Sequence, residues 1–179
     1  TLTIASAVTW KNFRCAPFSP IPRALSAGSD KEFRMTKIAA LTAENIQESV
    51  HAKLEGYKNL NVLEQYAMFM GKAQILEFGL KGLLSRMYGV PSENMEKWTL
   101  GKTKNELRDK GLRPDFITYL ESIVNYRNDM AHEFLINNAI TQSMANFSER
   151  KLYGNLFRAI YELEQIIIFY DWCEENNGW

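Results

Sequence analysis

Apolar residues recur every three or four positions through most of the chain after residue 42, which is the spacing of helices with one buried face. The longest continuous stretch of this pattern covers residues 63–87, or about seven helical turns. Its apolar positions are Leu63, Tyr66, Met70, Ala73, Leu76, Leu80, Leu84 and Met87. Alternation of apolar and polar residues, which would predict strands, is nearly absent. We therefore expect an all-α protein.

Capping and stop residues give the expected helix boundaries. Thr42 suits the start of a first helix, Gly89 and Pro91 end the second, and Gly111 caps a short third one. Pro114 fits the first turn of the fourth helix, and a loop over residues 137–142 precedes the last. The expected helices span residues 42–56, 63–87, 103–110, 114–135 and 148–173. Their apolar faces can be buried only together, so we predict an antiparallel bundle of about five helices.

The first 34 residues differ from the rest of the chain. They hold three of the five prolines, have no acidic residue before Asp30 and show no helical periodicity. We expect residues 1–34 to be a disordered or non-native segment, and residues 35–179, from Met35 onward, to be the folded domain. A transit peptide or a partner-binding tail are the alternatives for the first segment.

Composition narrows the classes of function. No run of about 20 apolar residues is present, so no membrane partner is expected. Cys15 and Cys173 form neither a disulfide framework nor a zinc motif, which favours a reducing, cytoplasmic setting. The chain is neutral overall, but residues 35–179 carry 16 basic and 19 acidic residues. An overall positive charge is therefore not what would attract nucleic acid to this protein.

One short segment carries the chemistry that the sequence offers, and it lies in the predicted fourth helix. Arg127 and His132 are separated by four residues, and Asn128 directly follows the arginine. An imidazole can move protons near neutral pH, and a guanidinium can hold a phosphate with paired donors. These are the groups that metal-free cleavage of a phosphodiester requires.

The expected geometry of this segment adds a second point. Arg127 falls in phase with the apolar stripe of its helix, where a charge is costly unless it is paired or functional. At about 100° per residue, Asn128 and His132 project from nearly the same face, and Arg127 and His132 differ by about 140°. Arg127 would then have to reach round the helix or act from a partner subunit.

An all-helical domain with this arginine, asparagine and histidine in a long helix resembles the HEPN superfamily, named for higher eukaryotes and prokaryotes nucleotide-binding. Its signature is an arginine and a histidine four to six residues apart with a polar residue after the arginine, and Arg127, Asn128 and His132 match it. The resemblance covers about residues 35–173. Glu77 and Lys81 match a softer accessory pattern, Glu-x-x-x-Lys, found in part of the superfamily.

The resemblance implies a metal-independent endoribonuclease that acts as a homodimer. His132 would serve as general acid or base, Arg127 would stabilise charge on the phosphoryl oxygens, and Asn128 would orient a phosphate oxygen or the imidazole. Toxin members carry a tyrosine two residues after the histidine, which an antitoxin modifies with AMP. Phe134 holds that position here, which excludes this mode of control and leaves other antitoxins or regulatory proteins open.

A basic stretch before the motif helix is a candidate surface for RNA phosphates. As a solvated loop and short helix it would need no function, and the two interpretations are evenly balanced. Its candidate RNA-binding residues are Lys102, Lys104, Arg108, Lys110 and Arg113. Glu77 and Lys81 are also spaced as an ordinary helix-surface ion pair.

Two alternatives to a nuclease remain. The first is a non-catalytic HEPN-like module that binds RNA, a nucleotide or a partner protein. The second is a helical scaffold in which Arg127 is paired with Glu77 or Glu121 in a polar network. We expect no cofactor and no metal, because no glycine-rich phosphate loop or metal-ligand motif is present.

Overall fold

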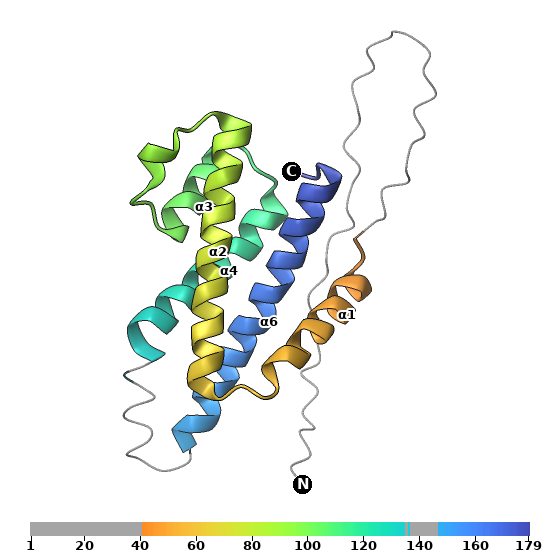
Figure 1. Cartoon of the computed structure of the whole chain (residues 1–179), viewed down its shortest axis with the longest axis vertical. Coiled ribbons are helices and arrows are strands. Elements are labelled where there is room, and N and C mark those ends of the chain that lie inside the picture. The colour runs from red at the N-terminus through yellow and green to blue at the C-terminus, as the bar shows by residue number, and fades with distance from the viewer. Residues whose placement is uncertain (1–40, 135, 137–146) are drawn as a thin grey trace.

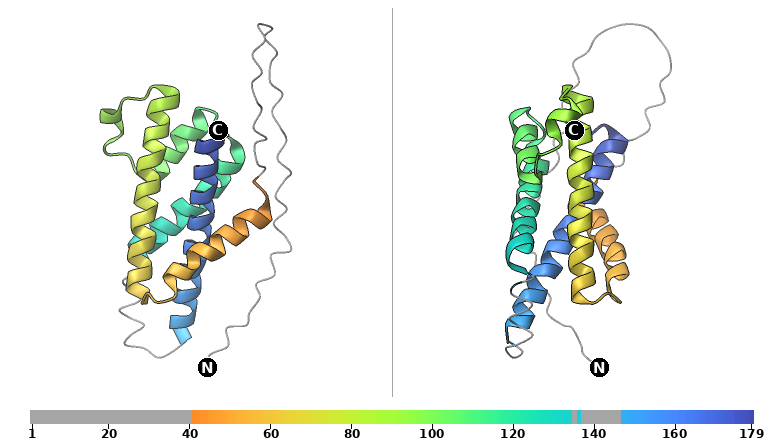
Figure 2. Two further views of the ribbon diagram at one scale, coloured as in Figure 1. Left: turned by 45° about the vertical axis from the view of Figure 1, so that its right-hand side comes forward. Right: turned by 60° about the vertical axis from the view of Figure 1, so that its left-hand side comes forward.

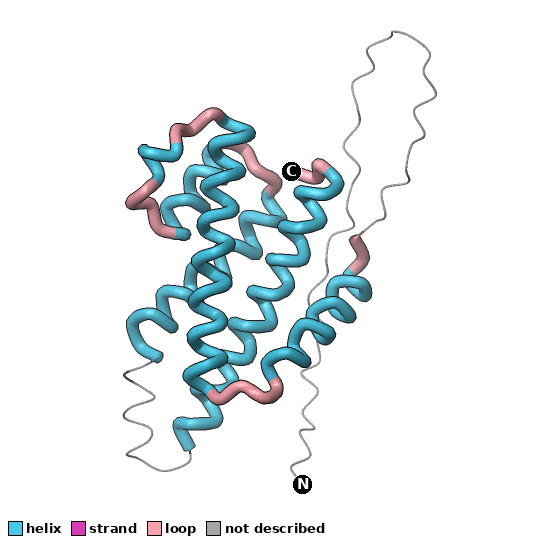
Figure 3. Tube along the Cα trace, in the orientation of Figure 1, coloured by secondary structure: helices cyan, strands magenta, loops and turns pink. Residues whose placement is uncertain are grey.

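The computed structural model describes residues 41–134, 136 and 147–179. In these residues the secondary structure is entirely helical, as the tube in Figure 3 shows. The predictions for residues 1–34, for the start of the domain at Met35, and for the loop over residues 137–142 lie outside the described part. No helix in the described ranges is both long enough and apolar enough to cross a membrane.

The described residues form five α-helices, which confirms the predicted all-α bundle. They are connected in part by short helical turns of other kinds. The elements are α1 (Ala43–Leu54), η1 (Glu55–Tyr57), α2 (Val62–Tyr88), η2 (Ser92–Met95), α3 (Leu100–Asp109), α4 (Pro114–Asp129), η3 (Met130–Phe134) and α6 (Phe147–Asn176).

Side chains and backbone conformation fix most of the helix ends where the sequence predicts them. The Thr42 hydroxyl accepts a hydrogen bond from the Asn45 amide at 3.2 Å, which caps α1. Asn61 and Glu64 form a reciprocal capping box at the start of α2. Gly89 ends α2 with φ at 66°, a left-handed conformation that glycine adopts without strain.

The third helix begins earlier than predicted. We expected it to start at Thr103, but Thr99 caps it and Leu100 is its first residue. Gly101, a poor helix former, concealed this start in the sequence. A Cβ at Gly101 would lie 3.4 Å from Val124 Cγ1, so the glycine sits where α3 packs closely on α4.

The central element is α6, which contacts α1, α2 and α4. The direction of the chain alternates along the four longest described helices, which are α1, α2, α4 and α6, and Figure 1 shows this alternation. Seen from the side in Figure 2, α4 with α3 lies on one side of α6 and α1 lies on the other. The helices therefore form an antiparallel bundle around α6.

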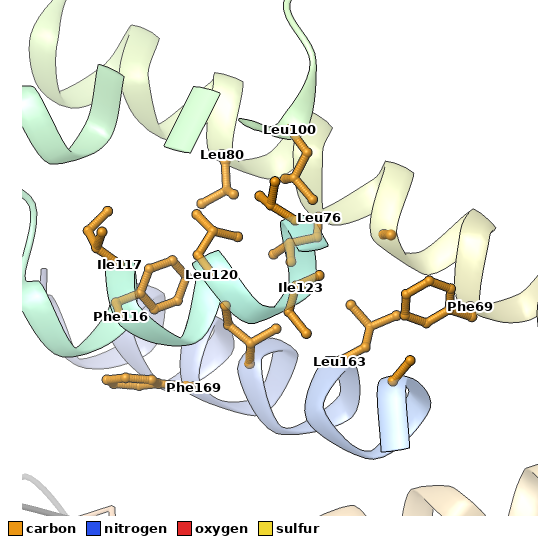
Figure 4. Close-up of a cluster of buried hydrophobic side chains, with 14 of the residues drawn as sticks. Phe69, Leu76, Leu80, Leu100, Phe116, Ile117, Leu120, Ile123, Leu163 and Phe169 are labelled. Atoms are coloured by element: carbon orange, nitrogen blue, oxygen red, sulfur yellow. The ribbon is translucent and has the colours of Figure 1, made fainter. Parts of the chain in front are cut away.

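The core lies where α2, α3, α4 and α6 meet. In Figure 4 Leu76 and Leu80 from α2 approach Leu120 from α4, while Phe116 lies beside Phe169 of α6. The rings of Phe116 and Phe169 pack edge to face with their centroids 5.5 Å apart. The predicted stripe of α2 is buried at its centre, whereas Leu63 and Met87 at its ends are exposed.

A buried carboxylate connects α6 to the first two helices. Glu164 has no exposed surface and accepts a hydrogen bond from the Tyr57 hydroxyl at 2.5 Å. Lys72 of α2 forms an ion pair with the same carboxylate oxygen, and its ammonium lies over the Tyr57 ring. The other oxygen, which accepts no hydrogen bond among the described residues, lies 4.0 Å from Lys53 Nζ of α1. A charge buried this deeply is tolerable only with such partners.

Truncation of a core side chain should lower the free energy of unfolding much more than truncation of an exposed apolar side chain. We expect Leu120→Ala to lower the free energy of unfolding by about 2–5 kcal/mol, because Leu120 is completely buried and a cavity would remain. Leu63→Ala, at an exposed apolar position, should cost less than about 1 kcal/mol. Urea unfolding followed by circular dichroism measures both, and equal losses would contradict the described packing.

Candidate functional site

The arginine and histidine of the motif lie on either side of a change in helix type. Arg127 is in the last turn of α4. The five residues that follow α4, Met130–Phe134, form a π-helical turn. Such turns are rare and occur frequently at functional sites. Arg127 is half-buried, whereas Asn128 and His132 are exposed.

The π turn corrects the geometry expected from the sequence. The predicted difference of about 140° between Arg127 and His132 assumed an unbroken α-helix. A π turn contains more residues per turn, so His132 is rotated less far from Arg127 than that value. Asn128 and His132 are both exposed, and their shared face stays a prediction.

Two buried side chains hold the π turn against the bundle. Met130 and Phe134 are almost fully buried, and the Phe134 ring stacks on Tyr66 of α2 with centroids 4.8 Å apart and planes 3° apart. Sequence analysis placed Tyr66 on the apolar stripe but did not associate it with the motif. Because the inward residues are fixed in this way, Ala131 and His132 between them face outward.

The ion pairs of the scaffold alternative are absent from the described residues. Glu77 binds Lys81 instead, with Nζ and Oε1 2.8 Å apart, and Glu121 binds Lys104. Within the same part of the chain, the Arg127 guanidinium makes no hydrogen bond or ion pair, although the Arg127 carbonyl accepts from the Met130 amide. A half-buried guanidinium in this state keeps its donors available for an anion.

Beside the motif, Tyr126 joins α4 to α6. Its hydroxyl donates to Glu162 at 3.1 Å, and Arg158 Nε donates to the same carboxylate at 3.2 Å. Burial, followed by the charge of Glu162, raises the pKa of the Tyr126 phenol to about 12. This tyrosine therefore connects α4 to α6.

The predicted RNA-binding residues divide by exposure, and ion pairs occur in both groups. Lys104 is buried in its ion pair with Glu121. Arg113 holds Asp115, with Nε and Oδ1 2.7 Å apart, and donates to the Gly178 carbonyl at 2.5 Å. Lys104 therefore connects α3 to α4, and Arg113 connects the start of α4 to Gly178, which follows α6. The exposed members of the set are Lys102, Arg108 and Lys110.

The start of α3 borders the face of α4 that carries the motif. Gly101 at the start of α3 covers Val124, and Asn128 follows Val124 by one turn on the same face of α4. Asn128 and His132 thus lie just past the edge of α3. Its first turn contains Lys102 and no acidic residue.

Among the described residues, no cluster of His, Cys, Asp and Glu side chains is arranged to hold a metal ion. The buried carboxylate Glu164, which sequence analysis did not select, has Tyr57 and Lys72 as partners and lies on the α1 side of α6. Burial and the neighbouring Glu164 raise the pKa of the Tyr57 phenol well above its usual value. A lone acidic residue in a helix carried no signal of this role.

No protein-family model, no curated protein and no solved structure matches this chain. The function is therefore inferred from the residues of this chain and their geometry.

The Tyr126–Glu162 contact should make stability depend on pH in alkaline solution. Between pH 10 and 12 the phenol is deprotonated in the unfolded chain and protonated in the folded one, so the free energy of unfolding falls as the pH rises. We expect Tyr126→Phe to reduce this fall, and Glu162→Gln to reduce it partly. Urea unfolding of the wild type and of both variants at pH 9, 10 and 11 measures how the free energy of unfolding changes with pH. The same pH dependence in all three proteins would show that the contact does not form.

Proposed function

We propose that this protein is a metal-independent endoribonuclease of HEPN type. The observation that supports this most strongly is the state of Arg127, a half-buried cation without a partner in the described residues, next to the exposed Asn128 and His132. A buried charge is costly, and an anionic ligand such as a phosphodiester would compensate this cost.

In the proposed reaction the 2′-hydroxyl of the RNA attacks the adjacent phosphorus. The imidazole of His132 accepts the hydroxyl proton, and the 5′ oxygen of the next nucleotide leaves with a proton from a second acid. Arg127 neutralises the charge that develops on the phosphoryl oxygens, and Asn128 donates to one of them. The products are a 2′,3′-cyclic phosphate and a 5′-hydroxyl, so neither water nor a metal takes part in this step.

A homodimer would supply the second acid, because each chain has one motif histidine. The end of the bundle that carries the motif also has exposed apolar side chains suited to a contact between copies. Ile136 follows the π turn, and Phe157 is adjacent to Arg158 of the Tyr126 network. Pairing there would place two copies of His132 near one cleft.

Lys102, Arg108 and Lys110 would bind the RNA backbone beyond the cleft. They are the exposed cations of α3 and the residue that follows it, and α3 starts next to the motif face of α4. Lys102 also lies over the Trp98 ring, with Nζ 5.2 Å from its centroid. The proposal leaves out Lys104 and Arg113, which are largely buried in their ion pairs, whereas Lys102 and Arg108 are exposed although they pair with Glu106 and Asp109.

Glu77 and Lys81 would support the site and take no part in the reaction. Their carboxylate and ammonium are 2.8 Å apart and mostly shielded from solvent. Both lie on α2, the helix to which Tyr66 and Phe134 fix the π turn. A role in positioning α2 against the motif turn fits this placement.

A toxin or phage-defence role in the cytoplasm is consistent with such an activity, with an antitoxin or other regulatory protein as partner. Phe134 is buried against Tyr66 and has no hydroxyl, so a modifying antitoxin would find no target at this position. Control would have to act on the exposed surface around Asn128 and His132.

A non-catalytic module that binds RNA, a nucleotide or a protein is the second candidate. The engagement of Lys104 and Arg113 favours it, because fewer cations remain to hold RNA than the sequence predicts. RNA binding without cleavage would identify this alternative.

Removal of the imidazole should abolish cleavage. In buffer with EDTA, we expect His132→Ala and Arg127→Ala to cut a labelled single-stranded RNA at least about 100-fold more slowly than the wild type. His51→Ala is the matched control, since His51 is an exposed histidine on α1 and should leave the rate unchanged. Cleavage that stops with EDTA, or that survives in His132→Ala, would contradict the proposal.

Loss of the accessible cations should weaken RNA binding without affecting the chemical step. We expect the triple variant Lys102→Ala, Arg108→Ala and Lys110→Ala to raise the Kd for single-stranded RNA and to reduce its dependence on salt concentration. Lys58→Ala, an exposed lysine on the α1 side of the bundle, is the control. Fluorescence anisotropy at several salt concentrations measures both, and unchanged slopes would exclude α3 from the interface.

A further inference from the structure

The outer face of α2 carries an apolar stripe that no described element covers. Phe78 and Ile75 are 79% and 72% exposed, the highest values among the exposed large apolar residues of the described chain, and Met68 is 41% exposed. With Gly71 and Gly82 they form a series spaced by alternating steps of three and four residues. This 3.5-residue spacing is characteristic of paired helices that wrap round each other. The stripe comprises Met68, Gly71, Ile75, Phe78 and Gly82.

The two glycines of the stripe have no explanation within one chain. A Cβ at Gly71 would meet nothing within 4 Å, and one at Gly82 would be in ordinary contact with Arg86 at 3.6 Å. Gly79 differs, because a Cβ there would lie 3.1 Å from the Tyr170 hydroxyl. Glycine inside a helix lowers its stability relative to alanine, so Gly71 and Gly82 point to close approach by another backbone.

We propose that the stripe is a homodimer interface in which α2 of one copy packs antiparallel to α2 of a second copy. A two-fold axis passing midway between Ile75 and Phe78 places Ile75 of one copy against Phe78 of the other. The same axis places Gly71 against Gly82, so both small positions coincide and the backbones can approach. Four of the five members of the stripe therefore have a matching partner in one register, as a self-complementary interface requires, and Met68 lies opposite Ser85 at the edge of the contact.

Charge selects the antiparallel direction. The stripe is flanked by Glu64 at its start and by Arg86, held by Glu174, at its end. Antiparallel pairing brings Glu64 of one copy within one turn of Arg86 of the other, whereas parallel pairing would align like charges. The stripe itself runs for about 21 Å along the middle of the 27-residue helix.

This surface is distinct from the motif, and the inference does not rest on the nuclease. Tyr66, which holds the π turn, lies near the start of α2, whereas the axis crosses the middle of the helix. Pairing through the stripe therefore puts the two motifs toward opposite ends of the interface. It leaves the motif face accessible for RNA or for a second contact.

Cross-linking tests the register directly. In the full chain with Cys15→Ser, we expect a mixture of Gly71→Cys and Gly82→Cys proteins to form a disulfide-linked dimer on mild oxidation, with little product from either protein alone. Equal cross-linking by Gly71→Cys alone would indicate a parallel pair, and no cross-link in the mixture would exclude this interface. Either result overturns the proposal.

Mass in solution provides an independent test. Sedimentation at 100 μM should show that Phe78→Glu has half the mass of the wild type, while Leu63→Glu, at an exposed apolar position of α2 outside the stripe, keeps the wild-type mass. Gly71→Ala should raise the Tm of the Phe78→Glu protein but, introduced into the wild type, weaken association through the stripe by about tenfold or more. A monomeric wild type, or a mass that Phe78→Glu leaves unchanged, would refute the interface whether or not the protein cleaves RNA.

Discussion

The bundle depends on α6 packing against three helices at once. Its apolar positions include Leu156, Ile160, Leu163 and Phe169, which are buried, and it contacts α1, α2 and α4. Glu164 lies within this buried surface and is compensated by Tyr57 and Lys72. Loss of this surface would separate the α3–α4 side, which carries the motif, from the α1 side. The position of the candidate site is thus determined by packing at some distance from it.

The motif turn shows how that packing shapes chemistry. Met130 and Phe134 are buried, and the stack of Phe134 on Tyr66 fixes the turn against α2. The π turn lets these two residues point inward while His132 points outward. The polar groups of the site therefore project from a rigid element, which favours precise placement of a substrate.

Much of the fold could be predicted from the sequence because its signals are local. The stripe over residues 63–87, the cap at Thr42 and the stop at Gly89 each depend on neighbours within a few positions. The cap and the stop match the structure, and so does the stripe except at its exposed ends, Leu63 and Met87. The start of α3 was missed because Gly101 is a poor helix former whose close contact with Val124 is invisible in the sequence. The pairs of Glu164 with Tyr57 and of Lys104 with Glu121 join distant segments, which no local pattern reveals. The same holds for the motif, where the residues were evident but the π turn was not.

The central claim is that Arg127 and His132 cleave RNA by attack of the neighbouring 2′-hydroxyl. The most direct measurement is the chemical identity of the new RNA end, by mass spectrometry after incubation with the full chain in EDTA. The account predicts a 2′,3′-cyclic phosphate opposite a 5′-hydroxyl, and no cut where a single 2′-O-methyl group replaces the attacking hydroxyl. A 3′-hydroxyl opposite a 5′-phosphate, or an unaltered cut at the methylated position, would contradict it.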